Sequence, residues 1–240
     1  MMKKTAAILC ALIFACFAQG ACAAERGAAA AEKIGTMLAA ELAPEKIEVT
    51  VAEDEKEAWV ECTGALLSGI RVESLKLRAQ LRKLPDANTA GGEALADLIT
   101  ASKGEMTLKV SDVNKYFAAG PEVRGFKELR FSFAKNGYTA KGVFEMNAVF
   151  ITLKLNLMAT GRLGLKKDGV YLEETELYAE NIKQPQNITE LVTGRVNPLL
   201  AFSKITFPVE FENITMNQNE AILTGHPQKI EKGWRWSWKK

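Results

Sequence analysis

The sequence is poor in the residues that bind metal ions or act as catalytic bases. His226 is the only histidine among 240 residues, and it lies beside Pro227 in a segment that we expect to be a loop. A metal site built on paired imidazoles is therefore excluded, and a lone loop histidine is more often a solvated side chain than a general base. No Walker loop, Gly-x-Ser-x-Gly elbow or His-Glu-x-x-His motif occurs either. These absences predict a protein without a metal, a cofactor or catalytic residues.

Cysteine is almost absent after the first two dozen residues. Of the four cysteines, only Cys62 lies beyond residue 24. It stands in the strand-like segment 58–62, where a cysteine is more often a small buried apolar residue than a reactive thiol. Loss of the first 24 residues would leave a single cysteine, so the rest of the chain could form no intramolecular disulfide.

The first 24 residues have the composition of a bacterial-type signal peptide. Two lysines precede an apolar run over 5–18, and small residues over 21–24 precede a charged pair. This order predicts cleavage after Ala23 or Ala24. The run is shorter than the roughly 20 residues that a membrane-spanning helix needs. We therefore expect an exported protein of the periplasm or cell envelope.

Two cysteines of this leader offer an alternative to ordinary cleavage. Cys16 and Cys22 both follow small residues at positions where a lipoprotein signal could place its acylated cysteine. A lipid on either sulfur would anchor the protein to a membrane, because each buried methylene contributes about 0.8 kcal/mol. The free and the membrane-anchored forms are both kept as hypotheses.

No excess charge of either sign remains after residue 24. Removal of Lys3 and Lys4 from the 31 basic residues leaves 29, which equals the number of acidic residues. A neutral chain has no global field that attracts nucleic acid, so nucleic acid is excluded as a partner. No repeat or low-complexity linker interrupts the chain, and we expect one domain over 25–240 with a tryptophan-rich tail over 233–240.

Hydrophobic periodicity predicts two substantial helices among many strands. The helices are expected over 28–42 and 187–202, the second kinked or split at Pro198. Short helices are expected near 94–99 and after Ser111 or Asp112. Period-two alternation predicts strands from residue 47 and over 68–81, 106–110 and 207–211, and turns at 135–137, 168–169 and 217–220 predict three hairpins.

The apolar residues change phase within two strand-like segments. Over 138–158 they occupy even positions up to Ala148 and odd positions from Val149, and a similar change occurs near Ser74. Such a change moves the apolar side chains to the opposite face of a strand unless an extra residue intervenes. We therefore expect one long strand over 138–158 with a β-bulge near Ala148, and a second bulge near Ser74. The predicted fold is α+β, a curled, mostly antiparallel β-sheet wrapping amphipathic helices around an apolar groove.

The C-terminal tail alternates tryptophan with polar or basic residues. As a strand it places Trp234, Trp236 and Trp238 on one face. One interpretation is a final edge strand whose indoles close the apolar face of the sheet. The other is a membrane interface, because indoles favour the headgroup region and Lys239 and Lys240 can meet phosphate.

Three segments are similar in order and pattern to one protein family. Residues 64–77 resemble its small-residue turn entering a strand, 104–117 its strand followed by a helix that carries an asparagine, and 207–225 its closing hairpin. On these segments the chain resembles the LmeA-like exported phospholipid-binding proteins over most of residues 47–225. The resemblance implies a non-catalytic cell-envelope protein that holds the acyl chains of phospholipid or another lipid in an apolar groove.

The candidate residues for that groove are apolar side chains of the predicted strands and helices. They are Phe117, Phe131, Phe133, Phe144, Phe150, Leu191 and Leu199. A plain core position is the alternative for each of them. Two other functions are kept as hypotheses: a structural or assembly protein that holds an envelope partner, and a hydrolase whose site is assembled from dispersed residues.

Overall fold

The computed structural model describes residues 25–85, 94–119, 126–148, 151–203 and 205–240. Side chains are described for all of these except 146–148 and 151–153. The predicted signal peptide, with Cys16 and Cys22, and the candidate Phe150 therefore lie outside the described residues. The described chain is α+β, with mostly antiparallel strands in two sheets.

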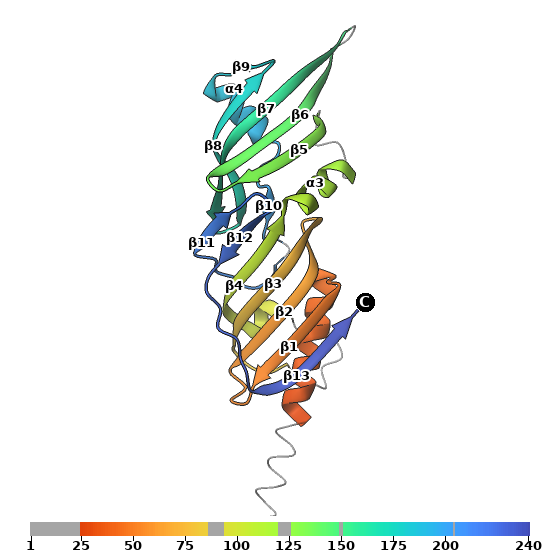
Figure 1. Ribbon diagram of the computed structural model, residues 1–240. Coiled ribbons are helices and arrows are strands. Elements are labelled where there is room, and N and C mark those ends of the chain that lie inside the picture. The colour runs from red at the N-terminus through yellow and green to blue at the C-terminus, as the bar shows by residue number, and fades with distance from the viewer. Residues whose placement is uncertain (1–24, 86–93, 120–125, 149–150, 204) are drawn as a thin grey trace, which may run out of the picture.

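The first sheet, sheet A, contains seven strands in the order β11-β12-β4-β3-β2-β1-β13. All of its neighbouring strands are antiparallel. Its strands are β1 (Lys46–Ala52), β2 (Glu57–Leu67), β3 (Ile70–Leu81), β4 (Ile99–Lys109), β11 (Asn213–Met216), β12 (Glu220–Thr224) and β13 (Gly233–Lys239). The sheet thus combines strands from both ends of the chain (Figure 1).

The second sheet, sheet B, follows the order β10-β8-β7-β6-β5, with β9 paired to β8. Its strands are β5 (Phe126–Ala134), β6 (Gly137–Ala148), β7 (Ile151–Lys166), β8 (Gly169–Ala179), β9 (Ile182–Lys183) and β10 (Leu200–Ala201). The hairpins predicted at 135–137 and 168–169 are confirmed, since Ala134 pairs with Gly137 and Lys166 with Gly169. Sheet B lies at the opposite end of the molecule from β13 (Figure 1).

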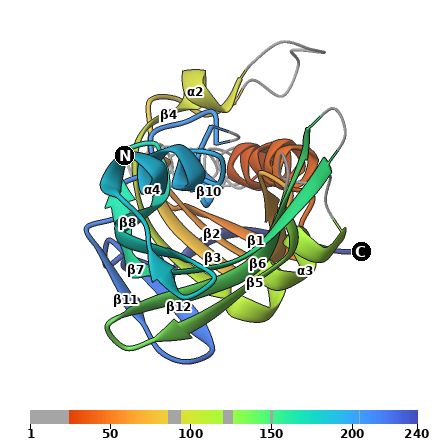
Figure 2. The same cartoon turned by 90° about the horizontal axis from the view of Figure 1, so that it is seen from above.

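Helices lie at the edges and on one face of these sheets. The N-terminal helix covers residues 25–42, and the others are α2 (Leu95–Leu98), α3 (Val110–Ala119) and α4 (Gln186–Thr193). The N-terminal helix packs against the face of sheet A that carries Ile47, Val49 and Val51, all fully buried. We call this apolar side the inner face and the opposite side the outer face. Figure 2 shows the helix and α4 on the same side of the two sheets.

The tryptophan-rich tail is the edge strand of sheet A. Strand β13 pairs with β1, and its indoles share the inner face with Ile47, Val49 and Val51. Trp234 and Trp236 are half-buried against the N-terminal helix, and a Cβ at Gly27 or Gly35 would overlap their respective rings. The edge-strand interpretation is therefore confirmed.

Helix α3 joins the two sheets. It begins where β4 ends and packs against β5, where the Asn114 side chain both accepts from the Phe131 N–H (2.7 Å) and donates to the Phe131 carbonyl (2.9 Å). At its start, the buried Asp112 accepts from the Arg71 guanidinium, which also bonds Glu45 and Glu73. These contacts fix α3 to both sheets.

The long strand predicted over 138–158 is wrong, because two strands occupy it. Strand β6 ends at Ala148, which pairs with Ile151 at the start of β7. The antiparallel pairing of the two strands places even positions of β6 opposite odd positions of β7. Phe144 therefore lies opposite Leu155, on the same side of the sheet. The bulge predicted near Ser74 is also wrong, because the β2–β3 ladder keeps one register there: Ser74 pairs with Thr63, and the next residue of β2, Gly64, adopts φ +67°. Neither sheet is curled or closed, so the single curled sheet is also wrong.

The helix predicted over 187–202 is confirmed only up to Thr193, and the strand predicted over 207–211 is wrong. Helix α4 ends at Thr193, and residues 200–201 form β10 beside β8. The Asn197 side-chain amide accepts a hydrogen bond from the Leu172 N–H and donates one to the Leu172 carbonyl. These two bonds hold the segment after α4 beside β8. Residues 207–211 belong to no strand, although Glu210 makes one bridge with Lys103 and Phe211 packs over Gly104.

Candidate functional site

Four of the predicted groove residues lie in the core or at its border. Phe131, Phe133 and Leu199 expose 2%, 4% and 3% of their surface. Phe117 is half-buried on α3, with its ring centroid 5.2 Å from that of Phe131. Phe117 and Phe131 pack α3 on sheet B, and core packing is the simpler interpretation for all four residues.

Two predicted groove residues lie where the inner face of sheet B is incompletely covered. Phe144 of β6 is half-buried beside Phe126, at a centroid distance of 5.4 Å, and the Arg195 guanidinium lies 5.3 Å from the Phe144 centroid. Leu191 of α4 is 62% exposed. The corresponding inner-face positions of sheet A are closed, since Ile47, for example, has no exposed surface.

Helix α4 buries a polar residue and exposes apolar ones. Thr189 is 2% exposed, and its hydroxyl donates to the Pro185 carbonyl, while Thr193 donates to the Thr189 carbonyl. These bonds satisfy the threonine hydroxyls within the helix, so the threonine side can pack against β8. Val192 also packs against the core, whereas Ile188 and Leu191 are left exposed, so the helix carries apolar side chains outside its buried side.

The exposed apolar residues of α4 belong to a larger apolar surface. Ile188 and Leu191 are exposed on α4, which packs against β8, and Arg195, just after the end of the helix, lies over the Phe144 ring of β6. Ile182 of β9, 67% exposed, pairs with Ala179 on the same inner face. We define the distal apolar face by these exposed or half-buried side chains: Phe144, Leu155, Ala179, Ile182, Ile188 and Leu191. It combines sites that are far apart in the chain.

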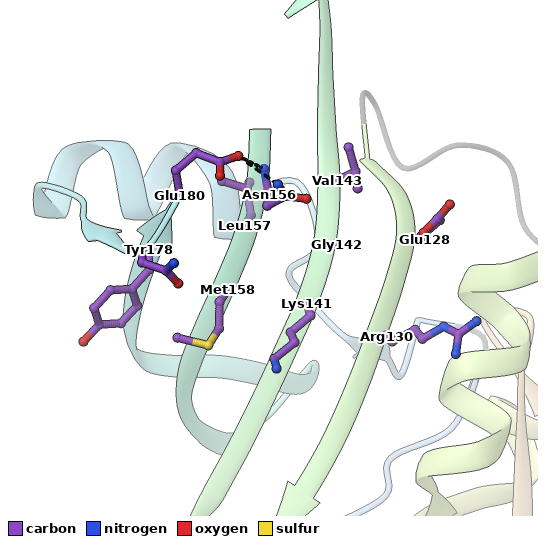
Figure 3. Close-up of a pocket in the computed structure, with 11 residues that line it drawn as sticks. Glu128, Arg130, Lys141, Gly142, Val143, Asn156, Leu157, Met158, Tyr178 and Glu180 are labelled. Atoms are coloured by element: carbon purple, nitrogen blue, oxygen red, sulfur yellow. Dashed lines mark hydrogen bonds between the residues drawn. The ribbon is translucent and has the colours of Figure 1, made fainter. Parts of the chain in front are cut away.

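The opposite, outer face of sheet B carries a polar hollow of about 460 Å³ (Figure 3). Arg130 and Lys141 are cross-strand partners, but their side chains point away from each other. Asn156 is held by Glu180, which accepts from its backbone and side-chain nitrogens. Most of the side chains that line this hollow are polar, with Val143, Leu157 and Met158 among them.

Cys62 and His226 are two described residues that could support catalysis, and His226 lines a hollow together with Ser102 and Glu210. No cluster of three metal-ligating side chains occurs among the described residues. Cys62 is fully buried as predicted, and burial raises the pKa of its thiol to about 12, so the reactive thiolate is not formed near neutral pH. His226 is exposed in a loop. None of the helices in the described ranges is long and apolar enough to cross a membrane.

The chain has no match among protein-family models, curated proteins or solved structures. Its resemblance to the LmeA-like proteins stays a prediction. Of the distal apolar face, the sequence predicted Phe144 and Leu191. Ile188 was missed because periodicity alone assigned it to the buried stripe of a longer helix. Ile182 was not predicted either.

Proposed function

We propose that this protein is a non-catalytic lipid-binding protein of the cell envelope that takes up acyl chains on its distal apolar face. The observation that carries the proposal is the exposure of Ile188 and Leu191 on α4. A helix exposes leucine and isoleucine at a cost in solubility, and contiguous apolar surfaces of this kind commonly mark binding sites. The resemblance to exported phospholipid-binding proteins supports the same ligand class.

The chemistry of the distal apolar face favours an acyl chain over a polar ligand. Its side chains come from β6, β7, β8, β9 and α4 and carry no polar atom. Each methylene of a bound chain that leaves water contributes about 0.8 kcal/mol, so ten buried methylenes would contribute roughly 8 kcal/mol before the cost of ordering the ligand. Arg195 beside Phe144 places a cation at the edge of this surface, where a lipid headgroup would lie.

Native mass spectrometry of the protein purified from its host tests the proposal directly. We expect co-purifying phospholipid or another acyl lipid, and binding of a fluorescent phospholipid by the lipid-free protein. Leu191→Gln should weaken that binding about tenfold, because it removes one well-exposed apolar contact. Leu66→Gln is the matched control, since Leu66 is 44% exposed on β2 of sheet A. Absence of bound lipid, or equal loss in both variants, would contradict the proposal.

An assembly role through the tail is the second candidate. Strand β13 pairs only with β1 among the described strands, so its other edge is free to add a partner strand. Deletion of the tail would also remove Trp236 from the N-terminal helix. Trp238→Gln is the cleaner test, because Trp238 is 39% exposed, and an unchanged set of captured envelope proteins would count against this role.

A further inference from the structure

A second surface, remote from the distal apolar face, gathers hydrogen-bond donors. The segment 226–232 lies against the outer face of sheet A, where Arg78 donates to the Gln228 carbonyl and Arg235 to the Glu231 carbonyl. Ile230 of this segment is 9% exposed. Beside the segment is a hollow of about 260 Å³, lined by side chains of β1, β2 and β13 and by Lys229. This volume is below the range typical of sites for drug-sized ligands and suits a small group.

Strand register explains which side chains meet there. Thr50 pairs with Trp59 on one side and with Arg235 on the other, and Glu48 pairs with Ser237. Because paired residues in antiparallel strands share a face, all five point to the outer side of sheet A. Lys229 closes the hollow from the covering segment. Two cations, two hydroxyls and one indole therefore surround a single carboxylate.

That carboxylate is already neutralised. Lys46 lies 2.6 Å from the Glu48 carboxylate, and this hydrogen bond lowers the pKa of Glu48, with the charges of Lys229 and Arg235 acting in the same direction. Neither Lys229 nor Arg235 is within ion-pair distance of a carboxylate in the described part of the chain. Most other cations near these strands are paired, for example Arg78 with Glu57. Lys46, Lys229 and Arg235 thus share the Glu48 carboxylate, which leaves an excess of positive charge at the hollow.

The Trp59 indole adds an independent observation. Trp59 is 4% exposed, and its Nε1 is the one buried side-chain nitrogen or oxygen without a hydrogen-bond partner among the described residues. A buried donor without an acceptor is costly, and such groups in native proteins call for a specific explanation. Trp59 forms part of the wall of this hollow. The Nε1 atom has almost no accessible surface, so an acceptor in the hollow reaches the indole N–H only after a small shift of the wall.

We infer that this hollow binds a phosphate-type oxyanion through Lys229, Arg235 and Ser237, next to the Trp59 indole. A guanidinium and an ammonium bind phosphate through short, charge-assisted hydrogen bonds, and a hydroxyl can donate to a further oxygen. The inference does not depend on acyl binding, because the distal apolar face belongs to the other sheet. The phosphate can come from a soluble compound or from a lipid headgroup.

The indole region of a proton–nitrogen NMR spectrum tests the inference. The protein has four tryptophans, whose indole signals are assigned by single Trp→Phe variants. Titration with inorganic phosphate should shift the Trp59 signal saturably and leave the Trp234 signal in place. Lys229→Gln and Arg235→Gln should each weaken this binding at least about tenfold. Lys232→Gln is the matched control, since Lys232 lies in the same segment but outside the hollow.

Vesicles then distinguish the two sources of phosphate. Salt-sensitive sedimentation with phosphatidylglycerol vesicles, absent with phosphatidylcholine and competed by phosphate, would support the site and assign a headgroup. A Trp59 shift without vesicle binding would support the site and assign a soluble phosphate compound. No saturable shift, the same shift with chloride, or equal weakening in Lys232→Gln would overturn the inference. Fluorescent phospholipid binding by Arg235→Gln reports separately on the proposed acyl site.

Discussion

The contact between Gly35 and Trp236 predicts that Gly35→Ala destabilises the wild-type protein but stabilises a variant that lacks the Trp236 ring. Gly35→Ala normally stabilises a helix by about 1 kcal/mol, because glycine is the poorer helix former. Here the new Cβ would overlap the Trp236 ring, which packs on the helix at this point. Overpacking costs about 1–3 kcal/mol, so we expect Gly35→Ala to lower the free energy of unfolding by about 1 kcal/mol.

Removal of the ring should reverse that result. Trp236 is half-buried, so Trp236→Ala should cost about 2–3 kcal/mol through lost packing. In this background the Cβ meets no ring, and Gly35→Ala should stabilise by about 1 kcal/mol. The coupling free energy between the two sites would then be about 2 kcal/mol.

Urea unfolding followed by far-UV circular dichroism measures all four proteins without relying on tryptophan fluorescence. Thr36→Ala is the matched control, because Thr36 is exposed on the same helix and should stabilise by roughly 0.5 kcal/mol in both backgrounds. If Gly35→Ala stabilised the wild-type protein as much as it stabilises Trp236→Ala, the tail would not pack on the helix, and the edge-strand assignment would lose its energetic basis.

Three further predictions concern the junction and the core. Asn114→Ala should cost about 2 kcal/mol in urea unfolding, because two hydrogen bonds to the Phe131 backbone are lost, and a cost near zero would contradict their role. Arg71→Gln should cost about 2–3 kcal/mol at neutral pH, since it removes a partner of the buried Asp112. Hydrogen bonds from Arg71 lower the pKa of Glu45 in the folded protein below its value in the unfolded chain. The ionised carboxylate therefore stabilises the fold above the unfolded pKa, and this stabilisation is lost as the pH falls through the lowered pKa. The variant should therefore lose less stability than the wild type on acidification, and parallel curves would refute this. Cys62 should react with a thiol reagent only as fast as the protein unfolds, whereas rapid labelling of the folded protein would show that its site opens locally.

Local patterns predicted most individual elements but not how two of them are joined. Period-two alternation correctly placed strands around Ile47, Leu108 and Phe131, and turn residues placed two hairpins of sheet B. The change of phase near Ala148 has two physical causes that a sequence does not distinguish, a bulge within one strand and a short turn between two strands. The sequence has no glycine or proline between Ala148 and Ile151 that would have indicated the end of a strand.

Tertiary contacts decided the remaining differences. Residues 194–202 have a helical pattern of apolar residues, but the Asn197 amide bonds Leu172 and draws the chain onto the edge of sheet B. Tertiary contacts also decide which aromatic residues of the candidate site are buried. Phe131 and Phe144 have equivalent positions in the alternation, yet α3 covers the first and little covers the second. Which aromatic side chains are covered depends on distant segments that periodicity does not report.

The connection of β13 to β1 has a consequence for the order in which the molecule can form. Sheet B is built from the continuous segment 126–201, and its strands β5, β6, β7 and β8 each pair with the next strand along the chain. Sheet A joins Lys46 to Lys239, and its inner face is closed only after this pairing is made. Loop closure across so long a segment is slow compared with hairpin formation. We therefore expect sheet B to acquire native hydrogen-exchange protection first, and the N-terminal helix to become protected only when the last strand docks.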